Sequence, residues 1–205
     1  MIFFDLDGTL IDSNGVWAQI DVDFLGARGL APTREYLDMV GHSIFPVAAQ
    51  FTRDYYRLEE TPEAIMDAWT GMAYDAYAKT IPLKPGARDF LDRCRESGER
   101  MALLTASLPA LCRAALAHHG LVGYFEGLFF AQEVGLEKRD PAVYPLAAKA
   151  FGVRPQACTL YEDAPDNCAA AKAAGFTVVG VYDDFYKARW EETKRVCDRW
   201  IVGFD

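Results

Sequence analysis

The chain has 205 residues, of which 51% are hydrophobic and 25% charged, and its formal net charge is −9. This balance is typical of a globular protein with a substantial core, and the length suits one large domain or a domain with a modest insertion. The acidic charge argues against binding along a nucleic-acid backbone, and no apolar run approaches the roughly 18 residues that cross a bilayer.

The N-terminal sequence and the cysteines bear on the expected location of the protein in the cell. The N-terminus, MIFFDLDG, has no basic leader, so we expect no signal peptide and a cytoplasmic location. Five cysteines without a CxxC spacing argue against a disulfide framework or a thiolate zinc site. We expect a monomer or weak dimer that binds neither nucleic acid nor membrane.

The first half of the chain begins with a short strand and continues as helices. Residues 2–6 predict an apolar strand that ends at Asp7-Gly8. Residues 14–79 follow a helical period, and Thr61-Pro62 predicts an N-cap followed by a helix-starting proline. The aromatic residues of this stretch are expected to be core: Phe51, Tyr55, Tyr56, Trp69, Tyr74 and Tyr77. His42 falls in a predicted loop and is interpreted as structural.

After a stiff linker at residues 81–86, strands and helices alternate. Buried strands are predicted at 101–105, 127–131, 158–161 and 177–182, with helices at 108–119, 141–151 and 166–174. This alternation predicts an α/β fold, with an open parallel-sheet, Rossmann-like core and a helical cap inserted after the first strand. The expected core is residues 1–13 and 83–205, and the expected cap is residues 14–82.

Chemically reactive side chains follow the predicted strands. In open parallel sheets, ligands bind at the carboxyl ends of the strands. Four places lie there or in the next loop: the segment from Asp5 to Thr9, the segment from Thr105 to Ser107, Lys138, and Glu162-Asp163. Together they supply carboxylates, a hydroxyl and an ammonium.

Four segments resemble the motifs of one family in their usual order. FFDLDGTLIDS, LLTAS, EKRDPAVY and YEDAPDNCAAAKAAG resemble the four motifs of the haloacid dehalogenase-like (HAD) hydrolases, in the subfamily with a helical cap. The resemblance covers the whole chain. Two positions depart from the family pattern: Arg139 follows Lys138 where proline is usual, and Asn167 stands where glycine is usual.

The resemblance and the chemistry assign the same reaction to the first motif. Asp5 would attack phosphorus to form an acyl phosphate, which divides one difficult displacement into two easier ones. Asp7 would protonate the leaving alkoxide and then take a proton from the hydrolytic water. The glycine of the Asp7-Gly8 turn lets the backbone bend close to a phosphate. The structural alternative is a strand-end turn in which Asp is a cap.

The remaining motifs would hold the metal and the phosphate. Clustered carboxylates need a hard cation, and by resemblance Mg²⁺ would take Asp5, the Asp7 carbonyl and Asp163, with Glu162 acting directly or from the outer shell. Glu162-Asp163 is also explained as an acidic pair before a helix, which is compatible with metal binding.

The phosphate would be bound by residues of the second and third motifs. Thr105 and the Ala106 N–H would hydrogen-bond a phosphate oxygen at a helix start suggested by Ser107, while Lys138 would neutralise developing charge. Alone, Thr105 is better explained as a strand end, and Lys138 as a surface residue.

The expected activity is Mg²⁺-dependent hydrolysis of a small phosphorylated metabolite, such as a sugar phosphate or phosphoglycolate. Dehalogenases and phosphonatases of the family lack the second Asp, which is present here as Asp7. A sugar phosphomutase stays open, although Trp17 occupies the place of the histidine that couples sugar binding to activation in such mutases. A non-catalytic phosphate-binding module is the alternative from a different class.

Overall fold

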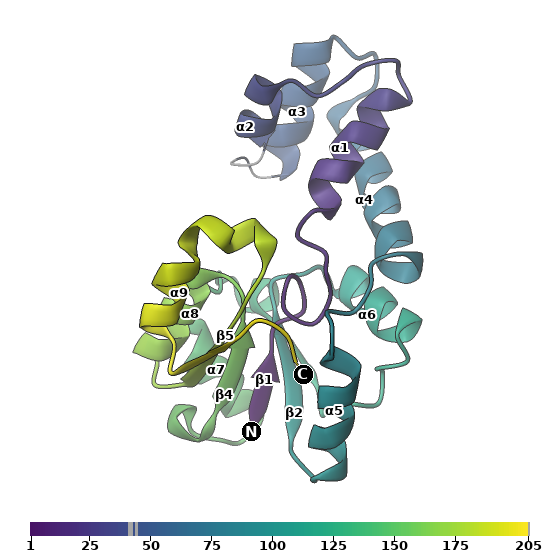
Figure 1. Cartoon of the computed structure of the whole chain (residues 1–205). Helices are drawn as coiled ribbons and strands as arrows, with labels where there is room; N and C mark the ends of the chain where they lie inside the picture. Colours follow the sequence, from purple (N-terminus) through teal and green to yellow (C-terminus); the bar gives the residue numbers. More distant parts are fainter. Residues whose placement is uncertain (41–42, 44, 205) are drawn as a thin grey trace. The chain divides into compact units, whose positions relative to one another are not determined.

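The computed structural model describes residues 1–40, 43 and 45–204; His42 lies outside them. The chain forms two compact units (Figure 1). The core unit comprises residues 1–14 and 81–205, and the helical unit comprises residues 15–80.

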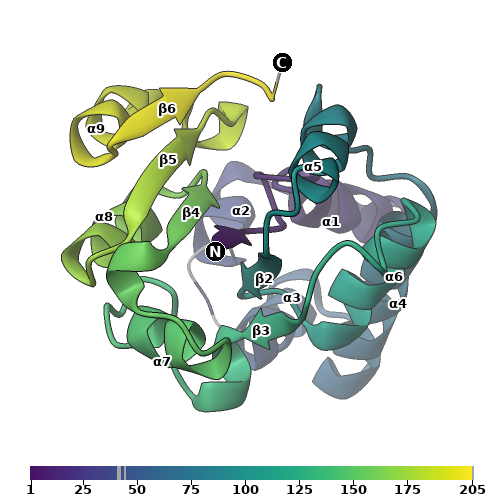
Figure 2. The ribbon, with the colours of Figure 1, turned by 90° about the horizontal axis from the view of Figure 1, so that it is seen from below.

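The core unit is built on a six-stranded parallel sheet in the order β3-β2-β1-β4-β5-β6. The strands are β1 (Ile2–Phe4), β2 (Met101–Thr105), β3 (Leu128–Phe130), β4 (Thr159–Glu162), β5 (Thr177–Val181) and β6 (Arg199–Ile201). Figure 2 shows this order from one end of the strands. The α/β fold with an open parallel sheet is therefore confirmed.

Helices cover both faces of the sheet. The α-helices are α5 (Ala87–Glu96), α6 (Pro109–His118), α7 (Val143–Ala150), α8 (Pro165–Ala173) and α9 (Trp190–Val196), and the 3₁₀ helices are η1 (Ala131–Val134), η2 (Pro155–Ala157) and η3 (Asp184–Arg189). Figure 2 shows α7, α8 and α9 on one face and α5 and α6 on the other. This double cover explains why the strands are continuous apolar runs rather than alternating ones. All five residues of β2 are buried.

Adjacent residues of β1 enter the two halves of the core. Phe3 lies in the cluster that includes side chains of α7 and α8, and its ring centroid is 5.5 Å from that of Phe151. Phe4 stacks on Tyr161 at 5.0 Å and meets Phe90 of α5 edge-on at 6.1 Å. These rings fix β1 at the centre of the sheet, so the residue after Phe4 emerges at the carboxyl edge.

The helical unit contains α1 (Val16–Gly26), α2 (Arg34–Val40), α3 (Phe45–Tyr56) and α4 (Pro62–Lys79). Its described residues contain no strand, as predicted. The Thr61 side chain accepts a hydrogen bond from the Ala64 N–H at 3.3 Å, and Pro62 is the first residue of α4. The predicted helix N-cap at Thr61 is therefore confirmed. Phe24 and Trp69 pack edge-on at 5.7 Å in its core.

Several local predictions were wrong. The strand β1 ends at Phe4, two residues earlier than predicted, because the Leu6 carbonyl accepts from the Leu10 and Ile11 N–H groups of the following loop. The helix α6 (Pro109–His118) begins one residue later than predicted, with Leu108 as its N-cap residue. Tyr74 is 48% exposed rather than core, because it lies on the solvent side of α4. Among the described residues, every helix is too short or too polar to span a bilayer.

Candidate active site

The central feature of the carboxyl edge is a buried contact between a lysine and two carboxylates. Asp5 follows β1, and its backbone N–H donates to the Tyr161 carbonyl at 3.0 Å, which holds it in line with β4. Lys138 Nζ donates to Asp5 Oδ1 at 2.6 Å and lies 2.5 Å from Glu162 Oε2. Asp5, Glu162 and Lys138 are each at most 5% exposed. Residues separated by more than 130 positions in the sequence thus meet in one buried ion cluster.

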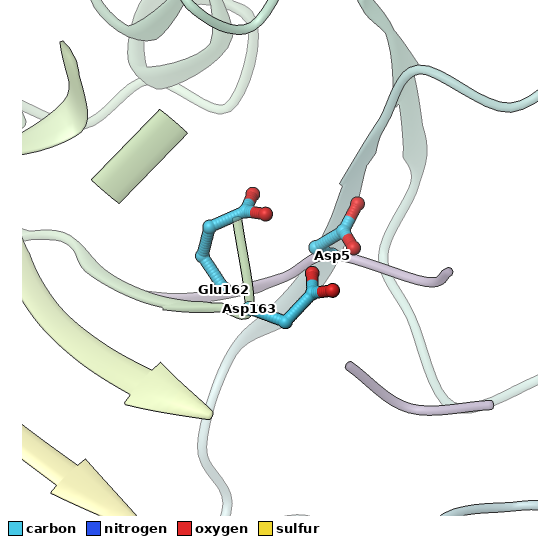
Figure 3. A group of neighbouring side chains, drawn as sticks. All are labelled: Asp5, Glu162 and Asp163. Atoms are coloured by element: carbon cyan, nitrogen blue, oxygen red, sulfur yellow. The ribbon is translucent and has the colours of Figure 1, made fainter. Parts of the chain in front are cut away.

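Asp163 completes a group of three buried carboxylates. Ligand atoms of Asp5, Glu162 and Asp163 all lie within 4.8 Å of one another. Figure 3 shows the three side chains as neighbours, Asp5 after β1 and Glu162 and Asp163 at the end of β4. Carboxylate oxygens at this spacing are the donor set that hard divalent cations such as Mg²⁺ prefer. The cluster therefore fits a hard divalent cation.

The pKa shifts of the carboxyl groups in this cluster also favour a bound cation. Burial raises the pKa of Asp5 to about 8, with Lys138 opposing the shift and Glu162 and Asp7 adding to it. Burial, followed by the charges of Glu162 and Asp5, raises the pKa of Asp163 well above its usual value. Negative charge is therefore in excess at this edge, and a cation would restore the ionised carboxylates.

Lys138 stays an ammonium despite its burial. Burial by itself would lower the pKa of this lysine, but the adjacent Asp5 and Glu162 outweigh that effect, and the net pKa is raised. The hydroxyl of Tyr144 lies 2.7 Å from the Lys138 carbonyl and 2.9 Å from the Asn167 carbonyl, which ties the Lys138 loop to α8. The lysine is thus a fixed positive charge beside Asp5.

Asp7 lies in the tight loop that follows Asp5. Its Oδ1 accepts a hydrogen bond from the Ser13 hydroxyl at 2.7 Å, and its side chain is partly exposed. The loop is closed by bonds from the Leu10 and Ile11 N–H groups to the Leu6 carbonyl, at 2.9 and 3.0 Å. A partly exposed carboxyl held by a hydroxyl can exchange a proton with a substrate or with water.

Thr105 and Ala106 lie at the end of the neighbouring strand. Thr105 ends β2 and is fully buried, and its Oγ1 accepts a hydrogen bond from the Ser107 N–H at 2.9 Å. That bond leaves the hydroxyl proton of Thr105 for another acceptor. Ala106 is exposed, and its carbonyl accepts from the Gln132 amide at 2.6 Å.

A cavity of about 480 Å³ opens at the same edge of the core unit. Its lining includes Ala106 and Lys138, together with Ala164, Asn167 and Tyr186. Burial and the nearby Asp163 and Glu162 raise the pKa of Tyr186 to about 12, so its phenol stays a neutral donor. A small ligand in this cavity would lie beside Lys138 and the residue that follows β2.

The two positions that depart from the family motifs differ in their contacts. Arg139 pairs with Glu137, both side chains being largely exposed, and it lines the same cavity as Lys138. The Asn167 amide donates to Glu162 Oε1 at 3.3 Å, and the same oxygen accepts from the Ala164 N–H at 3.1 Å. Glu162 is therefore held on one oxygen by α8 and on the other by Lys138.

Thr9, which lies in the first motif, and Asn14, to which the sequence assigned no site role, both bind Asp163. Thr9 Oγ1 donates to Asp163 Oδ1 at 3.1 Å, and Asn14 Nδ2 donates to Asp163 Oδ2 at 2.7 Å. Asn14 also reaches Asp183, which is buried and follows β5 by two residues. The rule that ligands bind at strand ends would have found Asp183, because it comes directly after a predicted strand.

Comparison with known proteins identifies the family. A family model described as haloacid dehalogenase-like hydrolase matches residues 1–175. Hexitol phosphatase B of Escherichia coli is 30% identical over 174 residues, which cover 83% of this chain and 78% of that protein. Fructose-1-phosphate phosphatase YqaB of Escherichia coli is 29% identical over 184 residues, covering 88% of this chain and 95% of that protein.

Solved structures show the same fold. A Thermotoga maritima protein assigned as a β-phosphoglucomutase superposes with a TM-score of 0.83 at 20% identity, covering 98% of this chain and 93% of that one. CbbY of Rhodobacter sphaeroides, solved with xylulose-1,5-bisphosphate, has a TM-score of 0.76 at 24% identity and covers 99% and 93%. With the motifs and the carboxylate edge in place, the chain belongs to the haloacid dehalogenase-like hydrolases.

Proposed function

We propose that this protein is a Mg²⁺-dependent phosphatase that hydrolyses a small phosphorylated metabolite through an aspartyl phosphate on Asp5. The observation that carries the proposal is the buried contact of Asp5 with Lys138 at 2.6 Å, beside the carboxylates of Glu162 and Asp163. This arrangement presents a nucleophilic oxygen and a fixed positive charge at the carboxyl edge of the sheet.

In the first half-reaction, a carboxylate oxygen of Asp5 forms a bond to phosphorus and the ester P–O bond breaks. Asp7 gives its proton to the leaving alkoxide, so the alcohol departs neutral. Thr105 and the Ala106 N–H hold a phosphate oxygen, and Lys138 offsets the charge that develops on the phosphoryl group.

In the second half-reaction, the Asp7 carboxylate takes a proton from water as the water oxygen attacks phosphorus. The bond between phosphorus and the Asp5 oxygen breaks, which releases inorganic phosphate and regenerates both carboxyl groups. One residue serves as acid and then base because its protonation state alternates.

The residues that would hold Mg²⁺ are the carboxylates of Asp5 and Asp163 and the backbone carbonyl of Asp7. When bound, the ion would neutralise the carboxylates and polarise the phosphoryl group. Glu162 would support this site from outside, because Lys138 meets one of its oxygens and the start of α8 holds the other.

The helical unit is proposed to be a cap that selects substrates and excludes water, with Asp12–Asn14 and Leu83–Gly86 as its hinges. The compact units at residues 1–14 with 81–205 and at 15–80 support a division close to the predicted boundaries. Names of relatives, which specify hexitol phosphates and fructose 1-phosphate, favour a polyol or sugar phosphate as the substrate class.

The test is a panel of phosphate monoesters with Mg²⁺, scored by released inorganic phosphate. A hexitol phosphate, fructose 1-phosphate and phosphoglycolate should be included, since relatives are named for all three. Turnover of at least one ester that stops with chelator is expected. Absence of phosphate release from the whole panel would favour a non-catalytic phosphate-binding module.

A sugar phosphomutase is the second candidate, favoured by the likeness of fold to a protein assigned as a β-phosphoglucomutase. Trp17 argues against it, because an indole has one N–H donor and no acceptor for a proton relay. Trp17 is 39% exposed and meets Phe45 edge-on at 5.7 Å. Supplying β-glucose 1-phosphate with a trace of the bisphosphate and following ³¹P NMR separates the two. Glucose 6-phosphate forming faster than inorganic phosphate would establish the mutase.

A further inference from the structure

The orientation of Asp163 is set by two hydrogen bonds, one to each carboxylate oxygen. Thr9 donates to Oδ1 at 3.1 Å, and Asn14 donates to Oδ2 at 2.7 Å. Asp163 is only 3% exposed, so these bonds form in a poorly solvated environment where they strongly favour one rotamer.

Asn14 is in turn fixed by a second carboxylate. Its amide nitrogen also lies 3.1 Å from Asp183 Oδ1, so both N–H groups of one amide can be shared between Asp163 and Asp183. The reverse orientation would place the amide oxygen against two carboxylates, which accept but do not donate when ionised. The bridge between the two aspartates therefore defines the direction of the Asn14 side chain.

Asp183 is itself held firmly. Its Oδ1 accepts from the Phe185 N–H at 2.9 Å, and its Oδ2 accepts from the Lys84 ammonium. The Asp183 side chain is 3% exposed and that of Lys84 13% exposed. A buried carboxylate is costly unless it is paired and hydrogen-bonded, and Asp183 is both.

Gly8 makes room for the bridge. A Cβ built on Gly8 would lie 2.1 Å from Asn14 Nδ2 and 2.2 Å from Asp163 Oδ2, so any side chain would displace the bond between them. The φ of +78° at Gly8 also favours glycine. The backbone of the first motif thus lies directly against the hydrogen bond that orients Asp163.

We propose that Asp183 is a positioning residue for metal binding, acting on Asp163 through Asn14. This inference rests on the proposed function, in which Asp163 is a metal ligand. Lys84 and the Phe185 N–H fix Asp183, Asp183 fixes the Asn14 amide, and that amide holds Asp163 in its ligating rotamer. Partners of metal ligands tune affinity in this way without touching the ion.

Direct binding of Mn²⁺, measured from the electron paramagnetic resonance signal of the free ion, tests the proposal without any turnover. The variants are Asn14→Ala, Asp183→Ala and their double mutant, with Asp183→Asn as a second variant in case Asp183→Ala does not fold. Asp183→Asn keeps one accepting oxygen, so the bonds that Asp183 accepts from Asn14 on Oδ1 and from Lys84 on Oδ2 cannot both persist.

Asp198→Ala is the matched control. Asp198 pairs with Lys172 and accepts from the Val178 N–H at 2.8 Å, so it makes the same two kinds of bond as Asp183 at a more exposed place in the core unit. It has no hydrogen bond to Asp163 or Asn14 among those described. Loss of an Asp–Lys pair is thereby separated from loss of the bridge.

We expect Asn14→Ala to raise the dissociation constant for Mn²⁺ roughly tenfold and Asp183→Ala about three- to tenfold, with Asp198→Ala unchanged. Because Asp183 acts through Asn14, the double mutant should bind no more than about twofold more weakly than Asn14→Ala alone. Effects that multiply in the double mutant, or an Asp183→Ala protein that binds as Asp198→Ala does, would overturn the inference. Wild-type protein that binds no Mn²⁺ would instead overturn the proposed function beneath it.

Discussion

The helical unit and the carboxyl edge of the core unit both bury polar side chains. They differ in the charge of these side chains and in the groups that pair with them. In the helical unit, the Tyr36 hydroxyl lies 2.7 Å from Asp21 Oδ1 and 3.1 Å from Thr52 Oγ1. The Thr52 hydroxyl also donates to the Ala48 carbonyl at 2.8 Å. The single carboxylate of this network thus meets a neutral hydroxyl, and the network stabilises the packing around Tyr36.

At the carboxyl edge, buried charge is left in excess. Asp5 and Glu162 share the ammonium of Lys138, and Asp163 adds a further carboxylate beside them. Natural cores seldom keep such an excess, since carboxylates in a poorly solvated site repel one another. The two regions thus differ in how much buried negative charge they hold, and each prediction below is designed to test that difference.

The largest effect is expected from Asp5→Asn. An amide cannot replace the carboxylate nucleophile, so phosphate release should fall on the order of 10³-fold or more while the fold is kept. Steady-state phosphate release and circular dichroism would measure both. Asp89→Asn, an exposed aspartate on α5, is the control and should retain full activity. Substantial turnover by Asp5→Asn would contradict the mechanism.

Removal of the metal should be the next largest effect. Excess chelator should stop phosphate release, and Mg²⁺ should restore it, because the clustered carboxylates and the phosphate need a cation between them. Ca²⁺ should substitute poorly because it tolerates looser geometry. Mg²⁺ should also raise the melting temperature of the wild type, as binding to the folded state requires. Full activity in chelator would remove the assigned role of Asp163.

Lys138→Met should reduce kcat/KM by about 10²- to 10³-fold, because a fixed charge beside the reacting group is lost. Methionine keeps much of the side-chain volume and leaves Asp5 and Glu162 without their shared ammonium. The control is Lys149→Met, on the exposed side of α7. A loss smaller than about fivefold would mean that Lys138 only balances charge in the fold.

The smallest effect is expected in the helical unit. Tyr36→Phe should lower the free energy of unfolding by about 1–2 kcal/mol, since Asp21 and Thr52 lose a hydrogen-bonding partner. The affinity for Mn²⁺ should not change, because this network contains no residue of the carboxylate cluster. Tyr74→Phe, at an exposed tyrosine of the same unit, should change neither quantity. Denaturant titration and Mn²⁺ binding would separate the two regions.

Much of the site could be predicted because of one simple rule. Parallel strands end at the same edge, so residues at or directly after strand ends lie there, as Asp5, Thr105 and Glu162 do. Lys138 lies in a loop beyond its strand, so the strand-end rule placed it at this edge, and its role beside the phosphate was implied by the resemblance. The helical character of residues 14–79 was predictable from apolar periodicity, which depends only on local spacing.

Other features of the structure could not be predicted from the sequence. The strand β6 was not predicted, because its three residues, Arg199–Ile201, are too few to show a strand period. Tyr74 follows the same helical pattern as Trp69 and Tyr77, yet it is exposed while they are buried. Periodicity identifies a helix but not the width of the face that neighbouring helices cover.

The sequence by itself determined the reactive groups, the strands that end beside them and the family. Only the tertiary structure decided how Asp163 is held, because its bond to Asn14 spans 149 positions and the bond from Asn14 to Asp183 spans 169. Such contacts depend on the turn at Gly8 and on where β4 and β5 end relative to β1. Local propensities fix neither, since hydrogen bonds across loops form only after the sheet has brought its strands together.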